Sequence, residues 1–224
     1  ELVRYCDDHH VELLNGIGYG DRLTVWTPDE VRGRLDEVVD GLLKIGIQPW
    51  FNLGYGNRLY TPEATNQFAV GWVPLWNEEA NQAWLRFVRA LAEHFGARIR
   101  HWEIWNEPNL AREWGGRPPN AGQYVSLLKE AYRRVKQADP NAMVISAGLT
   151  PTGTSSPEAT PDDAYLEQMY QSMGGSSDGY FDVLGAHAAG YKAPPEVSPE
   201  EADNNPLYGG ERFFCFRRVE DLRR

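Results

Sequence analysis

The chain has 224 residues, 42% of them hydrophobic, and its formal net charge is −10 at pH 7. This length and composition can bury a core, so the sequence predicts one globular domain and excludes a disordered segment. Its lysines and arginines are scattered among acids, which excludes a nucleic-acid partner, because a phosphate-binding surface needs clustered positive charge. No apolar run reaches the roughly 20 residues that cross a bilayer, so we expect a soluble chain with no membrane partner.

The first helix and strand are predicted between residues 27 and 53. Thr27-Pro-Asp-Glu30 is a capping box with Pro at the first helical position, which indicates the start of an amphipathic helix. Gly46 indicates its end. The apolar and aromatic segment Ile47–Leu53 follows and stops at a Gly-containing loop, as a buried strand would.

This order of helix and strand recurs three times. Each helix shows an apolar stripe of helical period, and each strand is a short apolar run followed by a polar loop. The helices are expected from Asn77 to Gly96, around residues 124–135 and around residues 166–173, and the strands at 99–105, 142–149 and 181–186. Residues 2–6 are a further strand candidate, and residues 11–21 have no clear period.

Helices that alternate with nearly continuous apolar strands indicate parallel pairing, with neighbouring units packed side by side. Two architectures fit, the doubly wound sheet and the (β/α)8 barrel. The long loops follow strands and no Gly-rich phosphate fingerprint opens a helix, which favours the barrel. About five strands are recognisable where a closed barrel has eight. The fold class is therefore predicted as α/β, a partial (β/α)8 TIM barrel with parallel strands and outer helices, incomplete at both ends, over a single truncated domain of residues 1–224.

The sharpest chemical signal is the run His101-Trp-Glu-Ile-Trp-Asn-Glu-Pro-Asn109, in which an apolar strand ends in an Asn-Glu pair. A carboxyl group in such a place is costly to bury and needs a reason. Flanked by Trp102, Trp105 and Trp114, Glu107 is expected to be partly desolvated, with a raised pKa. A raised pKa is what a general acid working near neutral pH requires.

The motif Trp105-Asn-Glu-Pro-Asn109 resembles that of the retaining glycoside hydrolases of clan A, in particular the family 39 xylosidase-like and family 5 cellulase-like members. The segments Ile47–Tyr55 and Phe181–His187 are similar as well, and residues 30–190 follow the family's order. The resemblance implies that Glu107 protonates the leaving oxygen and that Asn106 binds the sugar 2-hydroxyl. It implies a β-linked oligo- or polysaccharide substrate and no cofactor.

A retaining mechanism also needs a nucleophilic carboxylate about 5 Å from the acid/base. The resemblance places it on a seventh strand, and no Glu after Glu107 ends a predicted strand. We therefore expect a fragment that holds the acid/base half of the site, has its nucleophile beyond the C-terminal end, and is inactive alone.

Several other residues are candidates for binding. His187 ends the last predicted strand, where the family often has a His or Tyr that contacts substrate or nucleophile; the alternative is a histidine satisfied by backbone groups. Tyr55, Trp114 and Tyr191 lie in loops after strands and are candidates for stacking on sugars or for anchoring loops.

Structural roles are favoured for the remaining features. Asp7-Asp-His-His10 reads as a solvated turn rather than a metal site, because neighbouring side chains of an extended chain point to opposite faces. Asp162-Asp163 is expected to cap a helix, and Arg217–Arg224 to be a solvated helix face. Cys6 and Cys215 lack metal-ligand spacing and are expected to be packing residues.

Two rival functions stay open. One is a non-catalytic carbohydrate-binding barrel that kept the aromatic cleft. The other is a nicotinamide-dependent oxidoreductase, which the missing phosphate loop disfavours. The sequence leaves the sugar, exo or endo cleavage, the oligomeric state and the compartment, secretion included, undecided.

Overall fold

The computed structural model describes residues 13–14, 25–26, 28–57, 60, 62 and 71–223. Strands β3 (Trp50–Leu53), β4 (His101–Ile104) and β5 (Met143–Ser146) form a parallel sheet in the order β3-β4-β5. Consecutive order and parallel pairing are as predicted, although each strand is shorter than its apolar run. A separate antiparallel pair, β1 (Leu13–Leu14) and β2 (Val25–Trp26), lies where no element was assigned.

The long helices begin and end close to their sequence signals. Helix α2 spans Pro28–Lys44, and helix α3 spans Glu78–Phe95, with the Asn77 side chain accepting a hydrogen bond from Ala80 N as its cap. Helix α4 spans Ala121–Ala138 and helix α5 spans Asp162–Ser172. Short 3-10 turns occupy Pro74–Trp76 (η1), Gly96–Arg98 (η2), Ala111–Glu113 (η3), Pro206–Tyr208 (η4) and Phe216–Arg218 (η5).

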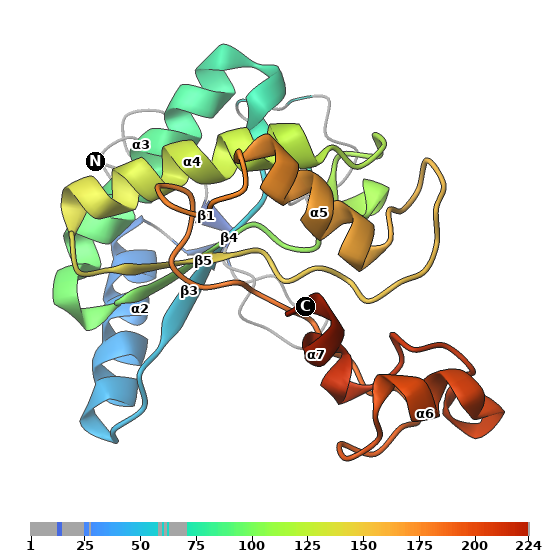
Figure 1. Ribbon diagram of the computed structural model, residues 1–224. Coiled ribbons are helices and arrows are strands. Elements are labelled where there is room, and N and C mark those ends of the chain that lie inside the picture. The colour runs from blue at the N-terminus through green and yellow to red at the C-terminus, as the bar shows by residue number, and fades with distance from the viewer. Residues whose placement is uncertain are drawn as a thin grey trace.

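The two crossover helices α3 and α4 lie against the same face of the sheet (Figure 1). That face carries Phe51, Trp102 and Val144, which pack into the main core. The opposite face carries the alternate residues of each strand, and Trp50 on it is 62% exposed. A doubly wound sheet has helices on both faces, whereas a barrel wall has them on one. The α/β fold with parallel strands and outer helices is confirmed, and this one-sided cover favours a barrel wall.

The predicted strand at residues 181–186 is not a strand. The segment runs parallel beside β5 but makes only isolated bridges, Ile145 to Val183 and Leu149 to Ala186. Side-chain oxygens replace ladder carbonyls here: Asp182 Oδ2 accepts from Val144 N at 2.7 Å, and Ser146 Oγ accepts from Gly185 N at 3.0 Å. A regular ladder is interrupted because these polar side chains compete with the backbone.

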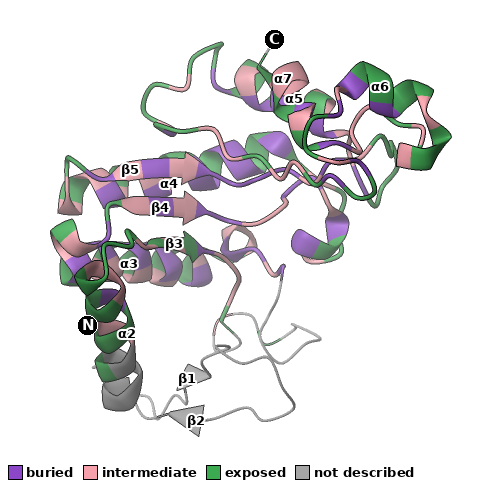
Figure 2. Cartoon of the chain, turned by 90° about the horizontal axis from the view of Figure 1, so that it is seen from below, coloured by how far each residue is buried: buried purple, intermediate pink, exposed green. Residues whose placement is uncertain are grey.

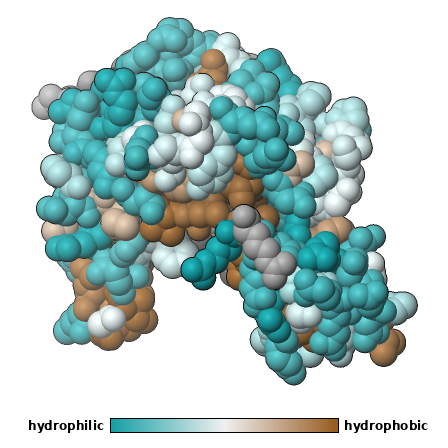
Figure 3. All heavy atoms as spheres, in the orientation of Figure 1, coloured by the Kyte–Doolittle hydropathy of each residue, from teal (hydrophilic) through white to brown (hydrophobic). Residues whose placement is uncertain are grey.

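Residues 190–222 form a C-terminal lobe with helices α6 (Pro199–Asn204) and α7 (Val219–Leu222). It has a small core of its own, which includes the buried Cys215, and lies beyond the carboxyl ends of the strands (Figure 2). Apolar surface lines the hollow between helix α2 and this lobe (Figure 3).

The lobe is tied to helix α5 by a buried ion pair, which corrects two predictions. Arg218 was expected on a solvated helix face, but its side chain is 4% exposed and donates to both carboxylate oxygens of Asp162, at 2.8 and 3.0 Å. Asp162 was expected to cap helix α5, but the N-cap is Pro161, without a side-chain cap bond. The guanidinium needs a buried carboxylate for charge compensation, and Asp162 supplies it.

Within the described residues, none of the helices has the length and apolar content needed to cross a membrane.

Candidate functional site

Glu107 lies in a tight turn directly after strand β4. Trp105 and Glu107 both have positive φ, 74° and 42°, a conformation that is uncommon and strained for residues other than Gly. Neighbouring strands hold the turn: Trp105 N donates to Leu53 O at 3.0 Å, and Glu107 N donates to Gly148 O at 3.2 Å. The carboxyl group is therefore fixed at the edge of the sheet where all three strands end.

Asn109, the last residue of the motif, has a structural task that the sequence reading missed. Its side chain is buried, donates to Thr150 O and Thr160 O at 2.9 and 3.1 Å, and accepts from Thr150 N at 2.9 Å. These bonds fasten the loop after strand β5 to the Glu107 turn. The sequence signal that could have indicated this role is the position of Asn109, two residues after the candidate catalytic Glu107.

Two basic side chains contact the Glu107 carboxylate. His187 Nδ1 lies 2.9 Å from Oε1, and Arg112 Nη2 donates to Oε2 at 3.2 Å. Gly148 makes room for the imidazole, since a Cβ there would lie 2.2 Å from the His187 ring. The structure thus brings two separately predicted site residues, Glu107 and His187, into contact with each other and adds Arg112, which the sequence did not single out.

These contacts lower the pKa of Glu107 to about 2, from an ordinary value of 4.5. The main cause is the hydrogen bond with His187, and it outweighs burial, which acts in the opposite direction. The same bond raises the pKa of His187 above its usual value of 6.5. The predicted rise of the Glu107 pKa is therefore wrong for this chain, because desolvation was considered without the hydrogen bonds that His187 and Arg112 make with the carboxylate.

Tyr55 lies on the other side of the turn, with its ring edge-on to Trp105 at 5.9 Å. Burial and the neighbouring Glu113 carboxylate raise the pKa of Tyr55 to about 12, so its hydroxyl stays protonated. Glu113 is buried, and its backbone oxygen accepts from the Trp105 indole at 2.8 Å. The half-buried Asn106 lies next to the Tyr55 hydroxyl.

Trp114 is not available to a sugar. It is completely buried, its indole N donates to Gln123 Oε1 at 3.3 Å, and its ring packs edge-on against Trp105 at 5.9 Å. A ring without an exposed face offers no stacking surface, so Trp114 is a packing residue beneath the Glu107 turn. Tyr191, by contrast, is 71% exposed. The Asp7–His10 cluster and the strand candidate at residues 2–6 lie outside the described residues.

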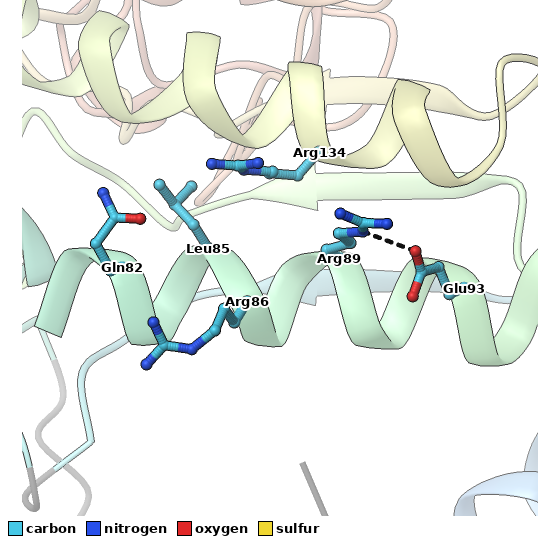
Figure 4. A pocket seen from close by; sticks show the side chains of 6 residues that line it. All are labelled: Gln82, Leu85, Arg86, Arg89, Glu93 and Arg134. Atoms are coloured by element: carbon cyan, nitrogen blue, oxygen red, sulfur yellow. Dashed lines mark hydrogen bonds and ion pairs between the residues drawn. The ribbon is translucent and has the colours of Figure 1, made fainter. Parts of the chain in front are cut away.

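A groove of about 300 Å³ lies between helices α3 and α4, lined by Gln82, Leu85, Arg86, Arg89, Glu93 and Arg134 (Figure 4). Arg89 and Glu93 form an ion pair within it at 2.7 Å. None of its lining residues belongs to the Glu107 site.

No protein-family model matches the chain. Over 118 residues it is 30% identical to a protein named Beta-xylosidase from Geobacillus stearothermophilus, a match that covers 49% of this chain and 23% of that protein. A second Beta-xylosidase, from Caldicellulosiruptor saccharolyticus, is 30% identical over 125 residues, with the same two coverages. The chain thus spans about a quarter of the length of these curated relatives.

The fold is similar to the structure of a family 39 glycoside hydrolase from Bacteroides cellulosilyticus WH2, with a TM-score of 0.50 and 24% identity. That match covers 74% of this chain and 29% of the other. These findings support the resemblance predicted from the Trp105–Asn109 motif: the chain is similar in sequence to two proteins named Beta-xylosidase and in fold to a family 39 glycoside hydrolase.

Proposed function

We propose that this chain carries the acid/base half of a retaining glycoside hydrolase site that acts on β-linked oligo- or polysaccharides. Glu107 is the acid/base and Asn106 binds the sugar 2-hydroxyl. The observation that carries the proposal is the Glu107 carboxylate, fixed in a strained turn at the carboxyl end of strand β4 and held by His187 at 2.9 Å. The nucleophile is contributed by polypeptide outside these residues, and no cofactor takes part.

The two steps of retaining hydrolysis require different protonation states of Glu107. In the first step, a nucleophilic carboxylate attacks the anomeric carbon while Glu107 gives a proton to the leaving oxygen; in the second, Glu107 takes a proton from the attacking water. With a pKa of about 2, Glu107 is ready for the second step. The first step needs a higher pKa.

A nucleophilic carboxylate nearby supplies that rise, since two like charges at short range disfavour ionisation of one of them. Displacement of Arg112 by substrate acts in the same direction. Its side chain is 73% exposed, so little packing holds it on Glu107.

One observation favours the rival, a non-catalytic carbohydrate-binding barrel. A carboxyl group with a pKa of about 2 is a poor acid near neutral pH, and His187 and Arg112 already satisfy its charge. In the rival, Glu107 accepts hydrogen bonds from a sugar and transfers no proton.

The experiment uses a longer protein that contains this chain, with Glu107→Ala and, as a matched control on the surface of helix α4, Glu130→Ala. In Glu107→Ala, aryl β-glycosides with good leaving groups should keep part of their glycosylation rate, because such groups depart without a proton. Natural β-glycosides should lose theirs. Azide should restore turnover and give a β-glycosyl azide.

Unchanged kinetics in Glu107→Ala, or no azide product, would remove Glu107 from the acid/base role. Saccharide binding without any turnover in the longer protein would favour the binding barrel. Turnover by the 224-residue chain alone would show that it already contains a nucleophile.

A further inference from the structure

Three aromatic side chains gather in the C-terminal lobe, which follows His187 along the chain. Tyr191 lies on Phe214, with ring centroids 4.4 Å apart and planes tilted by 54°, and Phe214 contacts Phe213 at 4.6 Å. We call Tyr191, Phe213 and Phe214 the aromatic platform. One face of the Tyr191 ring meets Phe214, and with 71% of the residue exposed the other face is open to solvent.

The platform is held in place from several sides. A Cβ on Gly153 would lie 2.7 Å from the Phe213 ring, and a Cβ on Gly209 would lie 2.5 Å from the Phe214 ring. Both rings therefore rest directly on backbone. Tyr191 itself has a positive φ of 49°, an uncommon conformation for a bulky residue. The Tyr191 ring packs against Phe214, which itself rests on the backbone at Gly209.

Two short chain segments join the platform to the Glu107 site. Tyr191 comes four residues after His187, which contacts Glu107 at 2.9 Å. Gly153, beneath Phe213, comes three residues after Thr150, whose buried hydroxyl lies beside the same carboxylate. Segments of three or four residues span at most about 10–14 Å. The lobe also lies beyond the carboxyl ends of the strands, on the side where the Glu107 turn lies (Figure 2).

The chemistry of the open face fits a sugar ring. A pyranose presents a face of C–H groups that packs on an aromatic ring, and a Tyr adds a hydroxyl at the wet edge of that ring. A protein partner needs about 800 Å² on each side, far more than one ring face offers. The site is also continuous, through His187 and Thr150, with the carboxylate proposed to act on a glycosidic bond.

We propose that Tyr191 on the aromatic platform is a further sugar-binding subsite, which holds a sugar unit of a β-linked oligosaccharide beyond the two units that lie nearest to Asn106 and Glu107. This inference rests on the proposed function and deepens it: the substrate is longer than a simple glycoside. Affinity should therefore rise with chain length until the substrate reaches Tyr191.

The test measures binding of xylobiose, xylotetraose and cellotetraose to the 224-residue chain by calorimetry and by NMR titration. Tyr191→Asn removes the ring while Asn tolerates positive φ, and Tyr191→Phe keeps the ring. Leu207→Ala, at another exposed apolar side chain of the same lobe, is the control for surface changes. Asn106→Ala tests the proposed function separately.

Tyr191→Asn should weaken tetrasaccharide binding about threefold to tenfold, the range of a stacked aromatic contact, and leave xylobiose unchanged. Tyr191→Phe and Leu207→Ala should bind each saccharide with the affinity of the unchanged chain. Equal tetrasaccharide affinity in Tyr191→Asn overturns the subsite, while weaker binding of both saccharides in Asn106→Ala leaves the proposed function standing. If no saccharide binds the unchanged chain, the subsite is overturned, while the proposed function is judged separately by the kinetics of Glu107→Ala in the longer protein. A change of molar mass in Tyr191→Asn, measured by light scattering, would make the ring a protein interface and overturn the subsite.

Discussion

Replacing His187 should release Glu107 from its ionised state. The His187 hydrogen bond is the largest cause of the fall of the Glu107 pKa from 4.5 to about 2. This fall corresponds to about 3 kcal/mol in favour of the carboxylate, at about 1.4 kcal/mol per pKa unit. Burial remains in His187→Ala and raises the pKa, so the pKa of Glu107 should return towards 4.5 or pass it.

The assay is a carbon NMR titration of the Glu107 carboxyl group, assigned by its loss in Glu107→Gln. Arg112→Ala is the matched control: it also removes a hydrogen bond to the carboxylate, but from a side chain that is 73% exposed and screened by solvent. The pKa should rise less in Arg112→Ala than in His187→Ala. The reverse order, or an unchanged pKa in His187→Ala, would refute the assignment of His187 as the main cause.

The same pair predicts how stability depends on pH. Because the pKa of Glu107 is lower in the folded chain, ionised Glu107 stabilises the fold at pH values above the unfolded pKa of 4.5. This stabilisation is lost as the pH falls through about 2. Because the pKa of His187 is higher in the folded chain, protonated His187 stabilises the fold at pH values below the unfolded pKa of 6.5. This stabilisation is lost as the pH rises through the pKa of the folded chain. The coupling between the two side chains, measured by a double-mutant cycle of urea unfolding, should therefore be largest between pH 4.5 and 6.5. Coupling that grows above pH 8 would contradict this sign.

Three further predictions concern packing and charge. Arg218→Ala leaves the Asp162 carboxylate buried without its guanidinium, so urea unfolding should show that the free energy of unfolding falls by about 3–5 kcal/mol. Arg217→Ala, at a half-exposed ion pair with Glu220, should lower it by about 1 kcal/mol or less. Equal losses in the two variants would contradict the buried role of Arg218. Gly148→Ala places a Cβ 2.2 Å from the His187 ring, so NMR titration should show a raised Glu107 pKa, while Gly41→Ala, in open space on helix α2, should leave that pKa unchanged. Trp114→Ala opens a cavity under the Glu107 turn and should lower the free energy of unfolding by about 3–5 kcal/mol; a loss below about 1 kcal/mol would show that the indole is not packed as described.

Local signals were sufficient to locate the long helices α2, α3, α4 and α5 and to place Glu107 directly after strand β4. Asn77 caps helix α3 and helix α2 begins at Pro28, because a cap is made within one turn of chain. The apolar runs located strands β3, β4 and β5, because the residues of each strand that face the helices pack into the core. The same reasoning failed at residues 181–186, where Asp182 and Ser146 make side-chain bonds that replace part of the ladder.

The charge state of the site was decided by contacts that no local pattern contains. Glu107 and His187 are 80 residues apart, and Asp162 and Arg218 are 56 apart, yet each pair is in hydrogen-bond contact. The sequence by itself determined which carboxyl group ends a strand, since periodicity and the Asn-Glu-Pro turn are properties of neighbouring residues. Only the tertiary structure decided that this group is ionised and that Trp114 is buried, because a pKa and a solvent-exposed area depend on distances to residues far along the chain.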